Sequence, residues 1–298
     1  MDFDKLLTFL TVADTKSFSR TAELLHVSQS TVTIRIKQLE ADLGKPLFLR
    51  DTRHVDLTSS AKALYPYLKR SFELIKEGEL AAKSILEFDD SLGVGSFHSI
   101  WHALLLPVVQ SYQRMHPSFA IRNFSGASER LIQLMLDGIV DISIIATVPK
   151  YPDLESVPMF NETFVLIGNL QQVADDVILS PEALRSLPFV YMKWESPFAD
   201  WFEREISIHF YPITEVDDST LLLRYIVENN GISFMPYSVA SIFMKKYNLK
   251  IYQFSKETPI RTLYLTYRKR RLDSMALCHF LELIHNRISC WSNEYGTK

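Results

Sequence analysis

Residues 28–37 include the side chains of the chain that are best suited to bind another molecule. On a helix that turns 100° per residue, one face carries Ser30, Thr33, Ile34 and Lys37, with Gln29 at its N-terminal end. Gln, Ser and Thr side chains at the start of a helix can hydrogen-bond base edges in a major groove, and Lys can reach a phosphate. Periodicity alone leaves an ordinary amphipathic surface helix equally open.

Three short helices would position this face. Ser17 or Ser19 suits the N-cap of the second helix, Ser28 suits the N-cap of the third, and Gly44 marks the end of the third. Three helices within about 45 residues predict a helix-turn-helix unit. Residues 47–57 then alternate around a polar tip, which predicts a two-stranded wing.

A long helix is predicted from Thr58 to Glu87. Apolar residues recur on one face of this helix at intervals of three and four residues, from Ala61 through Ile75 to Leu86. Such a stripe flanked by charges favours pairing with a second copy of the chain. Packing of the helix on its own domain is the alternative.

Composition narrows the class of protein. The chain has 298 residues, 47% of them hydrophobic, which is enough for two globular domains. The net charge of −3 argues against a globally basic nucleic-acid coat protein. The longest apolar run is too short to span a membrane, the N-terminus lacks the features of a signal peptide, and Cys278 and Cys290 have no zinc-type spacing. We therefore expect a cytoplasmic protein with no membrane contact.

After Asp90, short apolar runs alternate with helical segments, which predicts an α/β domain with largely parallel sheets and room for two lobes. The expected strands are LGVGS (92–96), FAIRNF (119–124), DISIIA (141–146), TFVLIG (163–168), PFVYMK (188–193) and GISFMP (231–236). The expected helices are Trp101–Met115, Ser128–Leu136, Ser219–Glu228 and Leu272–Cys290.

The N-terminal segment resembles the DNA-binding module of LysR-type transcriptional regulators. The resemblance rests on fixed spacings over about the first 65 residues: Ser17-Phe18-Ser19, Ala22, Leu25, Val27-Ser28-Gln29, Leu39-Glu40, Leu43-Gly44, Leu47-Phe48, Arg50 and Leu57-Thr58. LLLPVVQSYQRMHPSF, LDGIVDISI and NNGISFMP extend it more loosely over the remainder.

The resemblance implies an α/β protein with an N-terminal all-α winged helix-turn-helix over residues 1–58. A linker helix with dimerisation and hinge functions would cover 59–90. An effector domain similar to type 2 periplasmic binding proteins would cover 91–298, with lobe I at about 91–163 plus 267–298 and lobe II at about 164–266. The implied partners are double-stranded promoter DNA, a small-molecule effector, RNA polymerase and further copies of the chain, as a homodimer or homotetramer.

The resemblance also assigns residues to DNA. Family contacts fall on Gln29, Ser30 and Thr33, while Arg50 and Arg53 of the wing would approach the backbone or the minor groove. Where the family frequently has Arg, this chain has Ile34, which can rest on a thymine methyl but cannot hydrogen-bond a guanine. The full set of expected DNA contacts is Ser28, Gln29, Ser30, Thr31, Thr33, Ile34, Arg35, Lys37, Arg50 and Arg53, with Arg35 directed to phosphate.

The effector is expected where strands end and helices begin. Ser99 would cap a helix, alone or while contacting the ligand, and Ser128 opens the next helix. Trp194 and Phe198 would make the cleft aromatic, unless they serve loop packing. The expected contacts of an anionic or aromatic effector are Phe97, His98, Ser99, Ile100, Trp101, Ser128, Thr147, Trp194, Ser196 and Phe198.

Other chemistry finds little support in the sequence. His98 and His102 have a spacing that can bind metal on a helix, but no acidic or Cys residue nearby completes a site. On one continuous helix Cys278 and Cys290 would lie about 18 Å apart, too far for a disulfide. We expect no metal, no cofactor and no enzymatic activity. Two alternatives stay open: a DNA-binding regulator without an effector, and a ligand-binding or catalytic α/β protein whose N-terminal unit only oligomerises.

Overall fold

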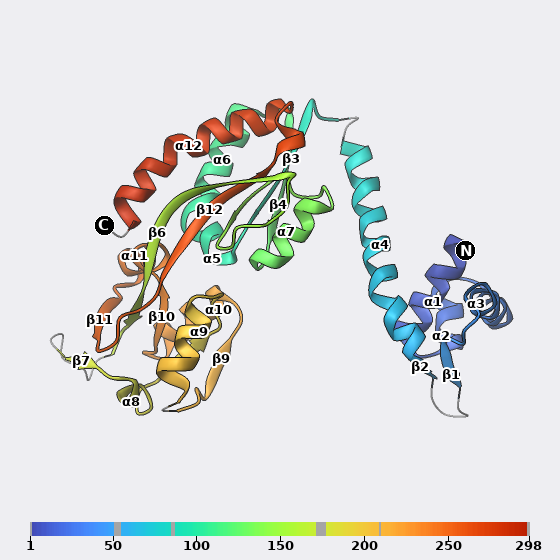
Figure 1. The fold of residues 1–298 in the computed structure, drawn as a ribbon, viewed down its shortest axis with the longest axis horizontal. Coiled ribbons are helices and arrows are strands. Elements are labelled where there is room, and N and C mark those ends of the chain that lie inside the picture. The colour runs from blue at the N-terminus through green and yellow to red at the C-terminus, as the bar shows by residue number, and fades with distance from the viewer. Residues whose placement is uncertain (1, 51–54, 85–86, 171–176, 209, 297–298) are drawn as a thin grey trace. The chain divides into compact units, whose positions relative to one another are not determined.

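The computed structural model describes residues 2–50, 55–84, 87–170, 177–208 and 210–296, and the chain divides into two compact units, Met1–Lys83 and Ser84–Lys298 (Figure 1). The elements of the first unit are α1 (Phe3–Thr15), α2 (Phe18–Leu24), α3 (Gln29–Leu43), β1 (Phe48–Arg50), β2 (Val55–Leu57) and α4 (Ser59–Ser84).

Local sequence signals fix the ends of these helices. The Ser17 hydroxyl caps α2 by accepting from the Arg20 N–H, and the Ser28 hydroxyl caps α3 by accepting from the Thr31 N–H. Gly44 ends α3 in the left-handed region, at φ +64°, which glycine adopts without steric cost. The predicted caps Ser17 and Ser28 are confirmed.

The first unit has its own apolar core, which the third helix helps to form. Val32, Ile36 and Leu39 are completely buried against α1, so the opposite face of α3 points outward, as predicted. The strands β1 and β2 pair antiparallel, with Phe48 opposite Leu57, and form the predicted wing. Its tip, with Arg53, lies outside the described residues.

Helix α4 divides into two halves by burial. Ala61 and Leu68 belong to the core of the first unit, and Phe72 packs against it. Farther along, Ile75 is 43% exposed and Leu80 is 55% exposed. Packing on its own unit therefore accounts for the first half of the apolar stripe, and pairing with another copy stays a prediction for the second half.

The second unit alternates helices and strands. Its elements are β3 (Asp90–Ser96), α5 (His98–Ile100), the π-helix η1 (Trp101–Leu105), α6 (Leu106–Met115), β4 (Phe119–Ser125), α7 (Ser128–Leu136), β5 (Ile142–Ile145), β6 (Leu154–Gly168), β7 (Ile178–Leu179), α8 (Pro181–Leu184), β8 (Val190–Met192), α9 (Phe198–Phe202), the π-helix η2 (Glu203–Ser207), β9 (Thr214–Val216), α10 (Ser219–Glu228), β10 (Ile232–Pro236), α11 (Tyr237–Tyr247), β11 (Lys250–Phe254), β12 (Ile260–Arg268), the 3-10 helix η3 (Lys269–Arg271) and α12 (Met275–Tyr295).

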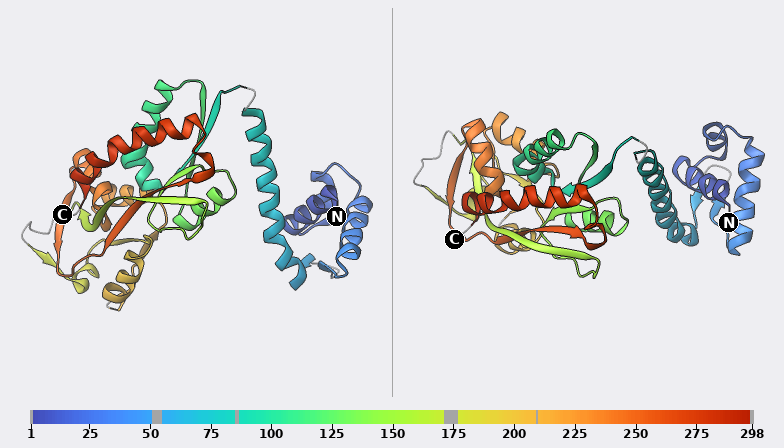
Figure 2. Two further views of the ribbon diagram at one scale, coloured as in Figure 1. Left: turned by 45° about the horizontal axis from the view of Figure 1, so that its top comes forward. Right: turned by 90° about the horizontal axis from the view of Figure 1, so that it is seen from above.

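The main sheet is mixed, so the prediction of largely parallel sheets was wrong. Its strand order is β4-β3-β5-β12-β6-β11-β7, with β10 also paired to β6. Strand β3 runs parallel to β4 and β5, but β12 is antiparallel to β5 and β6, and β10 and β11 are antiparallel to β6. The long strands β6 and β12 run side by side through the unit (Figures 1 and 2). The buried charged residues Glu162 and Arg261 interrupt the apolar pattern of these strands. The sequence analysis therefore did not predict their full length.

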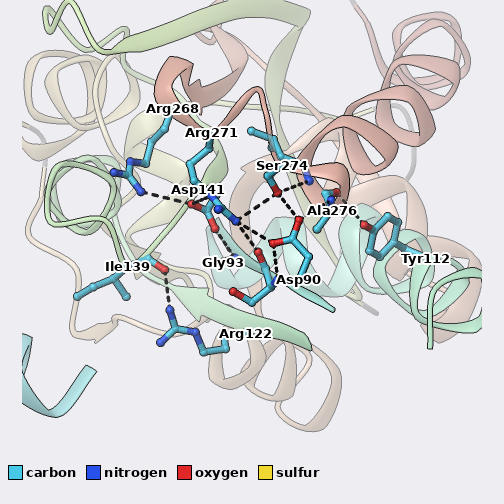
Figure 3. Close-up of polar contacts among 12 residues, drawn as sticks. Asp90, Gly93, Tyr112, Arg122, Ile139, Asp141, Arg268, Arg271, Ser274 and Ala276 are labelled. Atoms are coloured by element: carbon cyan, nitrogen blue, oxygen red, sulfur yellow. Dashed lines mark hydrogen bonds and ion pairs between the residues drawn. The ribbon is translucent and has the colours of Figure 1, made fainter. Parts of the chain in front are cut away.

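Helix α12 packs on β6 and β3, as Figure 2 shows from two sides. A cluster of polar side chains joins the start of α12 to the start of β3 (Figure 3). The Asp90 carboxylate accepts from the Ser274 hydroxyl at 2.7 Å and the Ala276 N–H at 3.0 Å, and it pairs with Arg271 at 3.3 Å. Burial raises the pKa of Asp90, but these hydrogen bonds and the Arg271 charge outweigh it and leave the pKa below its ordinary value. Asp90 is therefore held as a carboxylate.

Candidate functional site

The outward face of α3 gathers the polar side chains predicted from the sequence. Ser28, Gln29, Ser30 and Lys37 are exposed, Thr31 and Thr33 are half-buried, and Ile34 is 55% exposed. The side chains at its start are ordered by hydrogen bonds among themselves, since the Ser28 Oγ lies 2.7 Å from the Ser30 Oγ and 2.8 Å from the Thr31 Oγ1.

Gln29 is oriented from the neighbouring helix. Its Oε1 accepts from the Ser19 hydroxyl, at the start of α2, at 3.1 Å. The Thr33 hydroxyl donates to the Gln29 carbonyl oxygen at 3.0 Å. An amide held at the exposed N-terminal end of a helix can offer its N–H groups to an acceptor on a base edge.

Arg35 is already engaged within the unit. Its guanidinium forms an ion pair with Asp4 of α1 and lies 3.4 Å from the Thr8 hydroxyl. A phosphate contact by Arg35 would have to compete with this ion pair. The backbone of Arg50 lies in β1 opposite Val55.

Two cavities adjoin in the second unit and share one wall. The smaller, of about 220 Å³, is lined by Phe97, His98, Ser99 and other residues. The larger, of about 630 Å³, is lined by residues that include Ser128, Thr147 and Ser196. The shared wall consists of Ala127, Lys193, Trp194 and Glu195. The structure thus brings seven of the ten predicted effector residues to one region: Phe97, His98, Ser99, Ser128, Thr147, Trp194 and Ser196.

Ser128 is held at the start of α7 by a carboxylate from another segment. Glu195 Oε1 accepts from the Ser128 N–H at 2.5 Å, and Glu195 Oε2 accepts from the Ser128 hydroxyl at 2.6 Å. The same hydroxyl accepts from the Ala146 N–H, after β5, at 3.2 Å. Ala127 occupies the N-cap position and has no side chain that could cap α7, so Glu195 supplies this function.

Ser99 differs from its predicted role. The N-cap of its helix is Phe97, and Ser99 is the second residue of the helix, with a side chain that is 2% exposed. Its Oγ makes no hydrogen bond to any described residue, although it borders the smaller cavity. A buried hydroxyl without a partner carries a free-energy cost that a ligand can remove.

Three predicted ligand contacts belong to the core instead. Ile100 is completely buried, and Phe198, 1% exposed, stacks on Phe164 with ring centroids 4.4 Å apart. Trp101 is 8% exposed and donates its indole N–H to the Phe124 carbonyl at 2.8 Å. None of the three lines either cavity. Their large apolar side chains pack in the core. The sequence prediction relied on their position next to a strand end, and that position does not distinguish a core residue from a ligand contact.

Sequence reasoning missed a buried ion pair beside the smaller cavity. Arg261 Nε donates to Glu162 Oε1 at 2.9 Å, and the two side chains are 4% and 0% exposed. The other Glu162 oxygen accepts from the Ser238 N–H, at the start of α11, at 3.0 Å. The guanidinium also lies 5.7 Å from the Phe97 ring centroid and 5.9 Å from that of Trp194. Charged residues within the apolar patterns of 160–168 and 260–268 were the available signal.

Glu195 was missed as well, although both of its neighbours were predicted. It lies between Trp194 and Ser196, and only the fold brings it to α7, 67 residues away in the sequence. Among the described residues, no group of His, Cys, Asp and Glu is arranged to hold a metal ion. No described helix combines the length and apolar character that a membrane crossing requires.

Comparison with known proteins assigns both units. Residues 3–62 match the model of the bacterial regulatory helix-turn-helix protein family of lysR type, and residues 87–289 match the LysR substrate binding domain. The HTH-type transcriptional regulator HdfR of Yersinia enterocolitica is 26% identical over 242 residues, which are 79% of this chain and 81% of that protein.

Solved structures share the fold. Full-length CbnR in complex with its target DNA matches with a TM-score of 0.68 at 22% identity, over 96% of this chain and 99% of that chain. CrgA, a LysR-type transcriptional regulator from Neisseria meningitidis, matches with a TM-score of 0.54 at 19% identity, over 97% of this chain and 99% of that chain.

Proposed function

The chain belongs to the LysR family of transcriptional regulators, and from this premise we propose how its residues bind promoter DNA and a small-molecule effector. The observation that carries the proposal is the outward face of α3, where Gln29, Ser30 and Thr33 stand exposed or half-exposed above a buried core, next to a two-stranded wing. In a winged helix-turn-helix such a face enters the major groove.

Base reading is assigned to Gln29, Ser30 and Thr33, and an apolar contact with a thymine methyl to Ile34. Lys37 contacts a phosphate, and the wing adds Arg50 and Arg53. Ser28 and Thr31 order the start of α3 through their hydroxyl contacts. Arg35 contributes to phosphate binding only if it leaves Asp4.

The effector site is the pair of cavities around Glu195, between two lobes. We keep the division of β6 after Thr163, because β10 pairs with β6 only from Phe164 onward. In β12 we place the crossing near Leu263 rather than residue 267, because β5 pairs with β12 from Tyr264 onward. The effector contacts are Phe97, Ser99, Ser128 and Trp194, with His98, Thr147 and Ser196 at the margins. Ligand binding then shifts the population of lobe arrangements.

Assembly is assigned to α4. The exposed Ile75 and Leu80 would be covered by the α4 of a second copy, which gives a homodimer that can associate further into a homotetramer. Two linked DNA-binding units raise the effective concentration of each at its half-site. We place this function at promoter DNA in the cytoplasm, with RNA polymerase as a further partner, and assign no enzymatic activity and no cofactor.

A regulator without an effector is a second candidate, and one observation favours it. Glu195 already fills the N-terminus of α7 with a carboxylate of the chain itself. If that contact fixes the lobes permanently, the protein binds DNA in one state only.

The proposal is tested by selecting fragments of the encoding genome with the purified full-length chain at fixed salt, in an excess of random DNA. Footprinting of the selected fragments should show two protected blocks that survive the competitor, since two linked units bind two half-sites. Selection of no fragment above the random background would contradict the proposal.

A further inference from the structure

Arg261 is a buried cation with an unused hydrogen-bond donor. Its Nε donates to Glu162 Oε1 at 2.9 Å, which satisfies only part of the guanidinium. Its Nη2 lies 2.8 Å from the same oxygen, yet this nitrogen makes no hydrogen bond with any described residue. Because the side chain is 4% exposed, an unpaired N–H group here has a free-energy cost that a ligand oxygen would remove.

A second unsatisfied group borders the same cavity. The Ser99 hydroxyl is buried and has no partner among the described residues, and Ser99 and Arg261 both line the cavity of about 220 Å³. That volume lies below the roughly 300–1,000 Å³ of sites for drug-sized ligands, so one small molecule can contact both groups. Two donors at one small cavity suit the two oxygens of a carboxylate.

Aromatic rings surround the guanidinium and separate it from solvent. The Arg261 Cζ lies 5.4 Å from the ring centroid of Phe164, 5.7 Å from that of Phe97 and 5.9 Å from that of Trp194. Its partner Glu162 is 0% exposed. A hydrogen bond between charged groups is stronger in such a low-dielectric environment than in water, so a ligand oxygen on Arg261 would be held firmly.

The remaining charged side chains at this cavity do not exclude an anion. Both oxygens of Glu195 are occupied by the N–H and the hydroxyl of Ser128, at 2.5 and 2.6 Å. Lys193 and Asp217 also line the cavity, and they are exposed side chains of opposite charge. The two buried donors, rather than the net charge, therefore decide which ligand fits.

We propose that the smaller cavity binds a small carboxylate as the effector, with Arg261 as its anchor and the Ser99 hydroxyl as its second donor. The inference rests on the proposed function of this cleft as the effector site. Arg261 is absent from the contacts predicted from the sequence. Of the anionic and aromatic effectors expected there, this residue selects the anionic class.

The test uses the full-length chain, with propionate as the probe, propionamide as its uncharged match and chloride as the salt control. Propionate should raise the thermal midpoint of the wild type in a saturable manner, because binding to the folded state alone stabilises it. The expected gain is roughly 3–6 °C at about ten times the dissociation constant. Propionamide at equal concentration and chloride at equal ionic strength should not produce this gain.

Two variants locate the site. Ser99→Ala removes a donor that has no partner in the free protein, so the midpoint without propionate should not fall, while affinity for propionate should fall about tenfold or more. Arg261→Met combined with Glu162→Leu removes the buried pair at constant net charge and should abolish the response. Arg224→Met combined with Glu228→Leu removes an exposed pair in the same way and should keep the wild-type response.

Three results would overturn the inference: no propionate-specific gain in the wild type, an equal gain with propionamide, or undiminished affinity for propionate in Ser99→Ala and in the variant without the buried pair. Sequence-specific DNA binding by the wild type is measured without propionate. A chain that binds its DNA site and shows no propionate-specific gain keeps the proposed function and loses this inference. A chain with no DNA specificity fails the proposed function, whatever propionate does.

Discussion

At the scale of single residues, Gln29 carries the most specific assignment. Its Oε1 is held by Ser19, and it stands at the exposed end of α3. Gln29→Ala should reduce discrimination between the selected site and random DNA by about 1–3 kcal/mol, with little change in binding to random DNA. Competition binding at fixed salt measures both quantities.

Lys37→Ala is the matched control on the same face. Loss of a phosphate contact should weaken binding to every sequence alike and reduce the salt slope by about one. Equal losses on the selected site and random DNA for Gln29→Ala would instead remove Gln29 from base reading.

The buried pair Arg261–Glu162 sets a second residue-scale expectation. Arg261→Met leaves the Glu162 carboxylate buried without its partner, which should cost about 3–5 kcal/mol in the free energy of unfolding. The double variant Arg261→Met, Glu162→Leu should recover part of that loss. Denaturant unfolding of the full-length chain measures both.

An exposed ion pair provides the comparison. Arg224 and Glu228, one turn apart on α10, are 67% and 56% exposed, so Arg224→Ala should leave the free energy of unfolding nearly unchanged. A loss for Arg261→Met as small as that for Arg224→Ala would show that the buried pair does not hold β6 to β12.

At the scale of elements, the start of β3 depends on the charge of Asp90. Its pKa lies below the ordinary value, so its stabilisation is present above the pKa of the unfolded chain and is lost as the pH falls through the lowered pKa. Asp90→Asn should destabilise residues 84–298 by about 1.5–3 kcal/mol at pH 7, the contribution of hydrogen bonds to a charged group.

The pH dependence separates the charge from the shape of Asp90. The difference in unfolding free energy between wild type and Asp90→Asn should shrink on acidification below about pH 4. The neighbouring Asp89→Asn, at an exposed position, serves as control. A difference that stays constant down to pH 2 would contradict the assigned cause.

How far the sequence predicted these elements depends on the kind of pattern. The capping residues and the apolar face predicted the bounds of α3 closely, because Ser28 and Gly44 determine the helix ends through local backbone interactions. The antiparallel pairing of β6 and β12 could not be predicted from the sequence. The charged residues inside their apolar patterns are compensated by an ion pair, and its two members lie 99 positions apart in the chain. The same limit hid Glu195: its partner at α7 exists only in the folded chain. Ile100, Trp101 and Phe198 were misassigned because apolar side chains near strand ends serve packing as readily as binding.

At the scale of the whole molecule, DNA affinity is expected to depend on pairing through α4. Ile75→Glu combined with Leu80→Glu places charges on the exposed half of the apolar stripe. Sedimentation velocity should show a shift from dimer to monomer, and affinity for a two-block site should fall by about 100-fold. Lys76→Glu, a charge change at an exposed neighbouring position, should leave both unchanged. A dimer that survives the double substitution would show that another surface pairs the copies.

Sequence-specific recognition of DNA by the N-terminal unit is the function on which the other assignments depend. The most direct test is the ratio of the dissociation constants of the full-length chain for random DNA and for a site selected from the encoding genome, measured in the same buffer at fixed salt. We expect a ratio of about 10³ or more, as for sequence-specific regulators. A ratio near one, with affinity governed by salt alone, would contradict it.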